Sequence, residues 1–265
     1  YTADKFPPAK DPIGTGERYR PERIRVAYLS ADFHDHATAY LIAGLFEAHD
    51  RARFEISAIS FGPDPPGPMR GRLRPAFDRF LEVRETSERE TARLLRELEI
   101  DIAVDLKGYT TDARPGILAQ RGAPVQVSYL GYPGTLGADY IDYILADAYV
   151  IPAGHERFYS EKIVRLPGSY QVNDRKRAIA GQTPSRAELG LPRDGFVFCC
   201  FNNSYKIAPG VFDVWMRLLG QVPGSVLWLL EDNADATRNL VQEADRRGVA
   251  ADRLVFAPRF GLPEH

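Results

Sequence analysis

Residues 198–207 read Phe198-Cys199-Cys200-Phe201-Asn202-Asn203-Ser204-Tyr205-Lys206-Ile207. An apolar run that changes abruptly into amides, a hydroxyl, a phenol and a lysine is typical of a buried parallel strand whose carboxyl end opens onto an anionic ligand. Asn203, Tyr205 and Lys206 then mark the strand tip, where Lys206 acts as a point charge for phosphate. A solvated loop with a surface lysine explains the same residues.

Strands and helices alternate on both sides of this stretch. The apolar patterns upstream predict strands at 24–29, 55–61, 100–106, 125–130 and 143–146, with helices at 38–49, at 87–98 and from about 113. Downstream they predict strands at 196–201, 225–230 and 254–256 and helices at 211–220 and 235–247. This alternation indicates parallel sheets joined by right-handed crossovers, which is the α/β class.

A polar stretch at 173–194 interrupts the alternation and contains Pro184 and Pro192. We therefore expect an extended leading segment at 1–22, a first domain at 23–180 and a second at 181–265. The second domain has three predicted strands, about half of a doubly wound sheet, so we expect it to be truncated.

Composition excludes several classes of protein. No apolar run is long enough to span a bilayer, and the 34 basic and 36 acidic residues are interspersed, with a net charge of −2. We therefore expect no membrane or nucleic-acid partner. Cys199 and Cys200 are adjacent in one predicted strand, so we expect buried packing thiols of a cytoplasmic protein rather than a disulfide or a metal site.

Three other predicted strands end in polar or glycine-rich clusters. These read Ser30-Ala31-Asp32-Phe33-His34-Asp35-His36-Ala37-Thr38, Asp105-Leu106-Lys107-Gly108-Tyr109-Thr110-Thr111 and Ser128-Tyr129-Leu130-Gly131-Tyr132-Pro133-Gly134-Thr135. The two glycine-rich clusters also fit ordinary turns. Because ligands bind at the carboxyl ends of parallel strands, four such tips on two domains predict a cleft between the domains.

His36 is the candidate functional residue of the first cluster. Asp35 or Thr38 could simply cap the following helix and leave the histidines exposed. A metal site with His34, His36 and Asp32 or Asp35 is disfavoured, because no other histidine is nearby and the chain contains no Asp-x-Asp pair. We expect no metal.

Several further motifs are distributed along the chain from about residue 20. They are Arg25-Val26-Ala27-Tyr28-Leu29-Ser30-Ala31-Asp32-Phe33, Lys107-Gly108-Tyr109-Thr110, Ala123-Pro124-Val125-Gln126-Val127, Leu130-Gly131-Tyr132-Pro133-Gly134-Thr135, Asp142-Tyr143-Ile144, Tyr159-Ser160-Glu161-Lys162, Val222-Pro223 and Ser225-Val226-Leu227-Trp228-Leu229-Leu230. With the stretch at 201–207, these resemble the catalytic region of the O-GlcNAc transferase and Spindly family of protein glycosyltransferases, in its short bacterial form and incomplete at the C-terminus.

The resemblance implies a B-type glycosyltransferase with two Rossmann-like doubly wound domains, the second truncated. It implies metal-independent transfer of a sugar, N-acetylglucosamine from UDP-GlcNAc, to Ser and Thr hydroxyls of proteins, without a cofactor. Protein or peptide acceptors and upstream tetratricopeptide (TPR) repeats are the implied partners. A GDP-fucose-dependent O-fucosyltransferase and a non-catalytic scaffold fragment are the alternatives. We expect the 265 residues alone to be inactive.

The resemblance also assigns roles to residues. Lys206 would neutralise the diphosphate leaving group beside Asn203. His36 would lie against the donor sugar and phosphate with Tyr205 beside it. The donor-binding residues further include Leu130, Gly131 and Pro133 around the sugar and His265 near the nucleotide, and the acceptor side includes Thr110 and Tyr109.

Three departures from the family pattern stand out. The nucleotide-binding turn of the family lies beyond residue 265. Leu262 stands in place of a lysine. Asp101 and Leu98 stand where animal members have other polar residues, which leaves the general base open.

Overall fold

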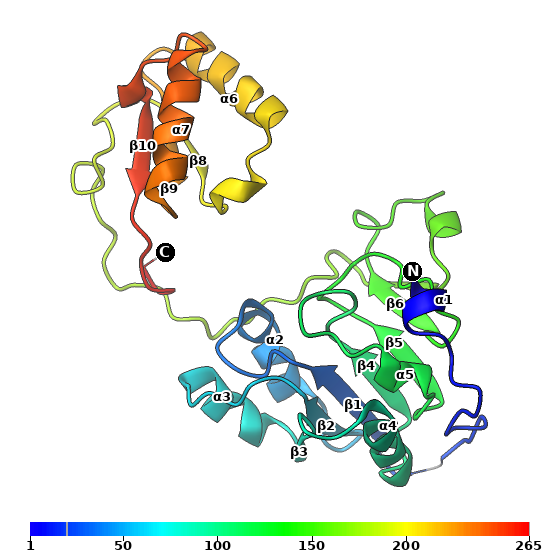
Figure 1. Ribbon diagram of the computed structural model, residues 1–265. Coiled ribbons are helices and arrows are strands. Elements are labelled where there is room, and N and C mark those ends of the chain that lie inside the picture. Colours follow the sequence, from blue (N-terminus) through cyan, green and yellow to red (C-terminus); the bar gives the residue numbers. More distant parts are fainter. Residues whose placement is uncertain (20, 265) are drawn as a thin grey trace. The chain divides into compact units, whose positions relative to one another are not determined.

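The computed structural model describes residues 1–19 and 21–264, and the chain forms two compact units, residues 1–176 and residues 177–265. The division falls inside the polar stretch 173–194. Each unit is an α/β structure with its own parallel sheet (Figure 1).

The first unit is built on a seven-stranded sheet in the order β3-β2-β1-β4-β5-β6-β7. All of its strand pairs are parallel. The strands are β1 (Ile24–Ser30), β2 (Phe54–Ser60), β3 (Arg79–Glu82), β4 (Ile102–Asp105), β5 (Val125–Ser128), β6 (Tyr143–Ala146) and β7 (Lys162–Arg165). The strand order reverses between β1 and β4, which is where open α/β sheets bind their ligands.

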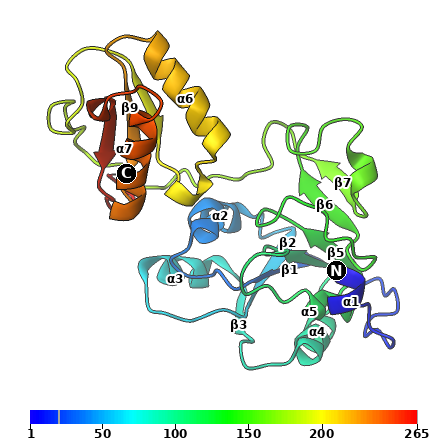
Figure 2. The ribbon, with the colours of Figure 1, turned by 45° about the horizontal axis from the view of Figure 1, so that its top comes forward.

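Both faces of this sheet are covered by helices. Val26 and Tyr28 of β1 face α2 (Ala37–Ala48) and α3 (Pro68–Leu73), whereas Ala27 and Leu29 face α4 (Glu88–Glu97) and α5 (Gly116–Ala119). Figure 2 shows the two helical layers on opposite sides of the strands. Alternate side chains therefore fill two cores, and the apolar runs of the sequence follow from burial on both faces.

The second unit contains three parallel strands in the order β10-β9-β8. These are β8 (Val197–Cys200), β9 (Val226–Leu230) and β10 (Leu254–Ala257), with helices α6 (Pro209–Gln221) and α7 (Ala234–Asp245). Phe212 and Met216 of α6 and Ala244 of α7 pack on Leu227 and Leu229 of β9.

The expected burial of both thiols is wrong. Cys200 is half-buried and packs in this core, whereas Cys199 is exposed. Successive side chains of a strand point to opposite faces, so Cys199 faces the side of the sheet that α6 and α7 leave uncovered.

The sequence predicted most of the strands and the longer helices and missed a few short elements. It gave no indication of β3, β7 or α3, and the leading segment at 1–22 is not wholly extended, because α1 (Thr2–Lys5) forms a helical turn. One-turn 3-10 helices complete the fold at η1 (Arg74–Ala76), η2 (Glu156–Phe158), η3 (Ser204–Lys206) and η4 (Ala251–Arg253). β3 and β7 are four-residue strands whose side chains are half-buried or exposed, and α3 and the 3-10 helices are too short to show a period.

Among the described residues, no helix is long and apolar enough to cross a membrane. Within the same part of the chain, no three His, Cys, Asp or Glu side chains are grouped so that they could hold a metal ion.

Candidate functional site

A buried ion pair joins the two strand tips at which the sheet order reverses. Asp32 follows β1 and Lys107 follows β4, and the register pairs Leu29 with Asp105, so the two strands end level. Lys107 Nζ lies 2.8 Å from Asp32 Oδ1 and 2.7 Å from Oδ2. Asp32 is 7% exposed and Lys107 4%. The sequence pointed to this edge of the sheet but not to this pair.

His36 caps helix α2 next to this pair. Its Nδ1 accepts a hydrogen bond from the Thr38 backbone N–H at 3.2 Å and lies 3.4 Å from Asp32 Oδ2. The alternative in which Asp35 or Thr38 caps α2 is wrong: Asp35 instead accepts the Met69 N–H at 3.0 Å, at the start of α3. The loop needs the Asp35 carboxylate for α3, so the next polar residue caps α2.

The imidazole of His36 is half-exposed, and its surroundings favour the neutral ring. Partial burial lowers its pKa below the ordinary 6.5, Asp32 opposes this, and Lys107 and His34 add to the lowering. Because Nδ1 accepts from Thr38, the proton of the neutral ring resides on Nε2. His36 therefore presents a hydrogen-bond donor rather than a base.

A carboxylate below the β4 tip holds the turn that carries Lys107. Asp105 is fully buried and accepts the backbone N–H groups of Lys107 and Gly108, each at 2.9 Å. Thr110 Oγ1 donates to the Lys107 carbonyl at 2.9 Å, and Gly108 adopts φ +57°, where a side chain would be strained. Burial raises the pKa of Asp105 to about 6, against the effect of these hydrogen bonds and of Lys107.

This titration makes a testable contribution to stability. Because the pKa of Asp105 is raised from 3.8 to about 6 on folding, its contribution is fully present below pH 3.8 and is lost as the pH rises through 6. Asp105→Asn has no carboxyl group to ionise, so this variant does not lose that stability as the pH rises. From pH 4 to pH 7 the variant should gain about 2 to 3 kcal/mol of unfolding free energy relative to the unmodified chain. Urea titrations at several pH values measure the difference, and a pH-independent difference contradicts the assignment.

The β5 tip contains a strained turn. Leu130 has φ +70°, and the Gly131 N–H bonds to the Tyr129 carbonyl at 2.9 Å, which is a γ-turn. A Cβ on Gly131 would lie 2.1 Å from the Leu106 carbonyl oxygen, so only glycine fits against the β4 tip. The side chain of Leu130 lies in the core, and Pro133 is exposed. Strain at a strand tip is typical of ligand sites, where the backbone makes the contact.

Glu161, which the sequence analysis quoted in a motif without giving it a role, fixes the loop after this turn. Its buried carboxylate accepts the Thr135 hydroxyl and the Leu136 N–H, both at 2.7 Å. Tyr159 donates to the Pro133 carbonyl at 3.1 Å. The segment at 159–161 thus clamps the segment at 133–136.

We expect Glu161→Ala to lower the free energy of unfolding by about 1 to 3 kcal/mol, because it leaves the buried N–H of Leu136 without an acceptor. Glu161→Gln keeps an acceptor oxygen and should lose less. Urea denaturation compares both variants with the unmodified chain. Equal losses for the two variants would show that the carboxylate oxygens do not hold this loop.

Tyr109, expected on the acceptor side, is tied to the N-terminal segment. Its hydroxyl donates to the Leu136 carbonyl at 2.8 Å and contacts the Thr2 hydroxyl, and its ring packs edge-on against Tyr1 and Tyr132. These residues border a pocket of about 500 Å³ in the first unit.

In the second unit, the predicted strand tip of β8 leads into the η3 turn. Asp232 fixes this turn by accepting the N–H and hydroxyl of Ser204 at 2.8 and 3.0 Å. Tyr205 is 80% exposed and Lys206 is exposed. Asn203 Oδ1 accepts from Arg259 Nη2 at 3.0 Å, which brings a second cation, from the segment after β10 and not singled out by the sequence, to Asn203.

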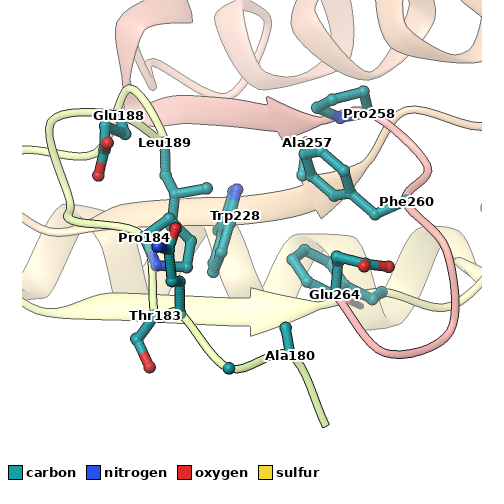
Figure 3. A pocket seen from close by; sticks show the side chains of 13 residues that line it. Ala180, Thr183, Pro184, Glu188, Leu189, Trp228, Ala257, Pro258, Phe260 and Glu264 are labelled. Carbon is teal, nitrogen blue, oxygen red and sulfur yellow. The ribbon is translucent and has the colours of Figure 1, made fainter. Parts of the chain in front are cut away.

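A cavity of about 940 Å³ lies on the face of this sheet that α6 and α7 leave uncovered. Figure 3 shows Trp228 in its middle, between Leu189 and Phe260. Trp228 Nε1 is buried without a hydrogen-bond partner among the described residues.

The structure thus gathers the candidate residues in two groups. In the first unit, at the ends of β1, β4 and β5, His36 lies beside the ion pair, Thr110 bonds to the Lys107 carbonyl, and Gly131 lies against the Leu106 carbonyl. In the second, Asn203, Tyr205 and Lys206 share one turn. His265 lies outside the described residues.

Comparison with known proteins gives one family. The sequence profile of glycosyl transferase family 41 matches residues 13–183 and 181–265. A protein of Arabidopsis thaliana named as a probable UDP-N-acetylglucosamine–peptide N-acetylglucosaminyltransferase, SEC, is 36% identical over 98% of this chain. The chain spans 27% of that relative.

A solved structure agrees with this family assignment. A mutant of the Thermobaculum terrenum O-GlcNAc transferase superposes with a TM-score of 0.81 at 30% identity, over 91% of this chain and 46% of that one. The lipopolysaccharide outer core galactosyltransferase WaaB shares the fold alone, with a TM-score of 0.55 at 14% identity over 91% of this chain and 69% of its own. The expected B-type glycosyltransferase fold is confirmed.

Proposed function

Because the chain belongs to glycosyl transferase family 41, we propose that it forms the catalytic part of an enzyme that transfers N-acetylglucosamine from UDP-GlcNAc to Ser and Thr hydroxyls of proteins. The names of the Arabidopsis relative and of the Thermobaculum enzyme support the sugar and the protein acceptor. The observation that carries the proposal is the pair of strand-tip groups, His36 beside the buried ion pair and Lys206 beside Asn203.

In the proposed reaction, an acceptor hydroxyl attacks the anomeric carbon of the sugar, and the diphosphate departs with the electron pair of the broken C–O bond. Negative charge grows on the diphosphate, so a fixed cation lowers the barrier more than a strong base does. Lys206 is that cation. The hydroxyl proton is lost late, to an oxygen of the departing diphosphate or to water, and the neutral His36 donates its Nε2–H to a donor oxygen.

We propose that transfer needs no divalent metal and no cofactor, since Lys206 supplies the positive charge at the diphosphate. Asn203 is the neighbouring polar contact, and the exposed Tyr205 bounds the donor. The backbone of Leu130 and Gly131, with Pro133, lines the sugar pocket. Thr110 and Tyr109 face the acceptor.

We also propose how protein acceptors are selected and where the reaction takes place. Protein acceptors are selected by tetratricopeptide repeats upstream in the longer protein, and the protein acts in the cytoplasm. His265 contacts the nucleotide.

A donor panel tests this function. The full-length protein that contains this chain is incubated with a Ser/Thr peptide library and either UDP-GlcNAc or GDP-fucose, and nucleotide release is measured with and without EDTA. We expect peptide-dependent release of UDP that EDTA leaves unchanged. Release of GDP alone would mean an O-fucosyltransferase, and release from neither donor would support a scaffold role.

A further inference from the structure

Three ionisable groups meet at the point where the sheet order reverses. Asp32 shares both carboxylate oxygens with Lys107 Nζ, at 2.8 and 2.7 Å. One of these oxygens, Oδ2, also lies 3.4 Å from Nδ1 of His36. The Asp32 carboxylate therefore contacts both the Lys107 ammonium group and the His36 imidazole.

The Nδ1 atom of His36 has two competing neighbours. Its lone pair accepts the Thr38 N–H at 3.2 Å. Protonated, the same nitrogen could instead donate to Asp32, but it would then lose the cap of α2, because one ring nitrogen cannot accept and donate at once. A lone carboxylate at 3.4 Å favours the protonated ring.

We propose that Lys107 is a positioning residue that satisfies Asp32 and thereby keeps His36 neutral, with Nδ1 accepting from Thr38 and the proton on Nε2. The inference rests on the proposed function only for the role of the neutral ring. In that role, the fixed Nε2–H of His36 is a hydrogen-bond donor to the nucleotide sugar. Loss of Lys107 favours the protonated form of His36, which pairs with Asp32.

The surroundings of His36 support this arrangement. Among the described residues, the charged and titratable groups that act on it are Asp32 from the β1 tip, Lys107 from the β4 tip and His34 from its own loop, whose ring lies edge-on at 5.8 Å. Partial burial, Lys107 and His34 lower the pKa of His36, and Asp32 alone raises it. The 4% exposure of Lys107 keeps solvent from screening its charge.

NMR titration of the His36 ring in this 265-residue chain tests the inference without any activity. The chain has five histidines, and His36→Gln identifies the signal of His36 by its loss. In the unmodified chain we expect ring ¹⁵N shifts of the neutral Nε2–H form. In Lys107→Met the titration midpoint should rise by about one pH unit or more.

Three further variants keep the test decisive. Asp32→Asn/Lys107→Met removes both charges and should abolish the rise, and Lys107→Gln supplies the same loss of charge with polar atoms if Lys107→Met does not fold. Lys162→Met, an exposed lysine of β7, is the matched control and should leave the midpoint unchanged. An unchanged or lower midpoint in Lys107→Met and Lys107→Gln, or an Nδ1–H ring in the unmodified chain, overturns the proposal whether or not the protein transfers sugar.

Discussion

Replacing Lys206 with alanine should lower sugar transfer at saturating donor by about 100-fold or more and leave the fold intact. The loss is large because a preorganised cation at a developing negative charge typically contributes this much to the rate. The fold should survive because Lys206 is exposed, and its one charge-related contact among the described residues is the Tyr205 ring, 6.0 Å from Nζ. Its removal leaves no buried partner unpaired.

Lys206→Ala is to be compared with two further variants, all in the full-length protein. Lys206→Arg keeps the charge in a different shape and should retain part of the activity. Lys162→Ala removes an exposed lysine elsewhere and should behave like the unmodified protein. A loss below about tenfold in Lys206→Ala would remove Lys206 from the diphosphate site.

The second large effect concerns His36. We expect His36→Asn to lower turnover by about 100-fold, because the variant loses the Nε2–H that donates to the nucleotide sugar. Asparagine is a favoured N-cap, so helix α2 should keep its first hydrogen bond and the melting temperature should change little. Turnover number and melting temperature together separate the two roles.

His34→Ala is the control for this variant, because His34 lies in the same loop without a hydrogen bond to helix α2 among the described contacts. We expect near-normal turnover from it. Equal losses in His34→Ala and His36→Asn would favour a paired-histidine site over a single donor.

The sequence predicted the main elements because both faces of the first sheet are buried. Val26 to Leu29 of β1 then form a continuous apolar run, and helix α4 carries a clear apolar stripe. The edge strands β3 and β7 have four residues each, and these residues are half-buried or exposed. Their sequences therefore resemble those of loops. The exposure of Cys199 follows from which face of the second sheet lacks a helix, and no local pattern encodes that.

The site was predictable to the level of strand tips and no further. Parallel strands end at one edge, so polar residues after β1, β4, β5 and β8 could be recognised as candidates. The pairing of Asp32 with Lys107 depends on the register of β1 against β4, across 75 residues of chain. A lysine directly after a buried strand was the available signal, because a buried cation requires a carboxylate.

The most direct test of the account is the position of the sugar on a product. The full-length protein is incubated with UDP-GlcNAc and a Ser/Thr peptide library in EDTA, and modified residues are located by mass spectrometry with electron-transfer fragmentation. The account predicts N-acetylhexosamine on Ser and Thr oxygens, and almost none with Lys206→Ala. Sugar on other residue types, transfer that requires a metal, or equal modification by the Lys206 variant would contradict it.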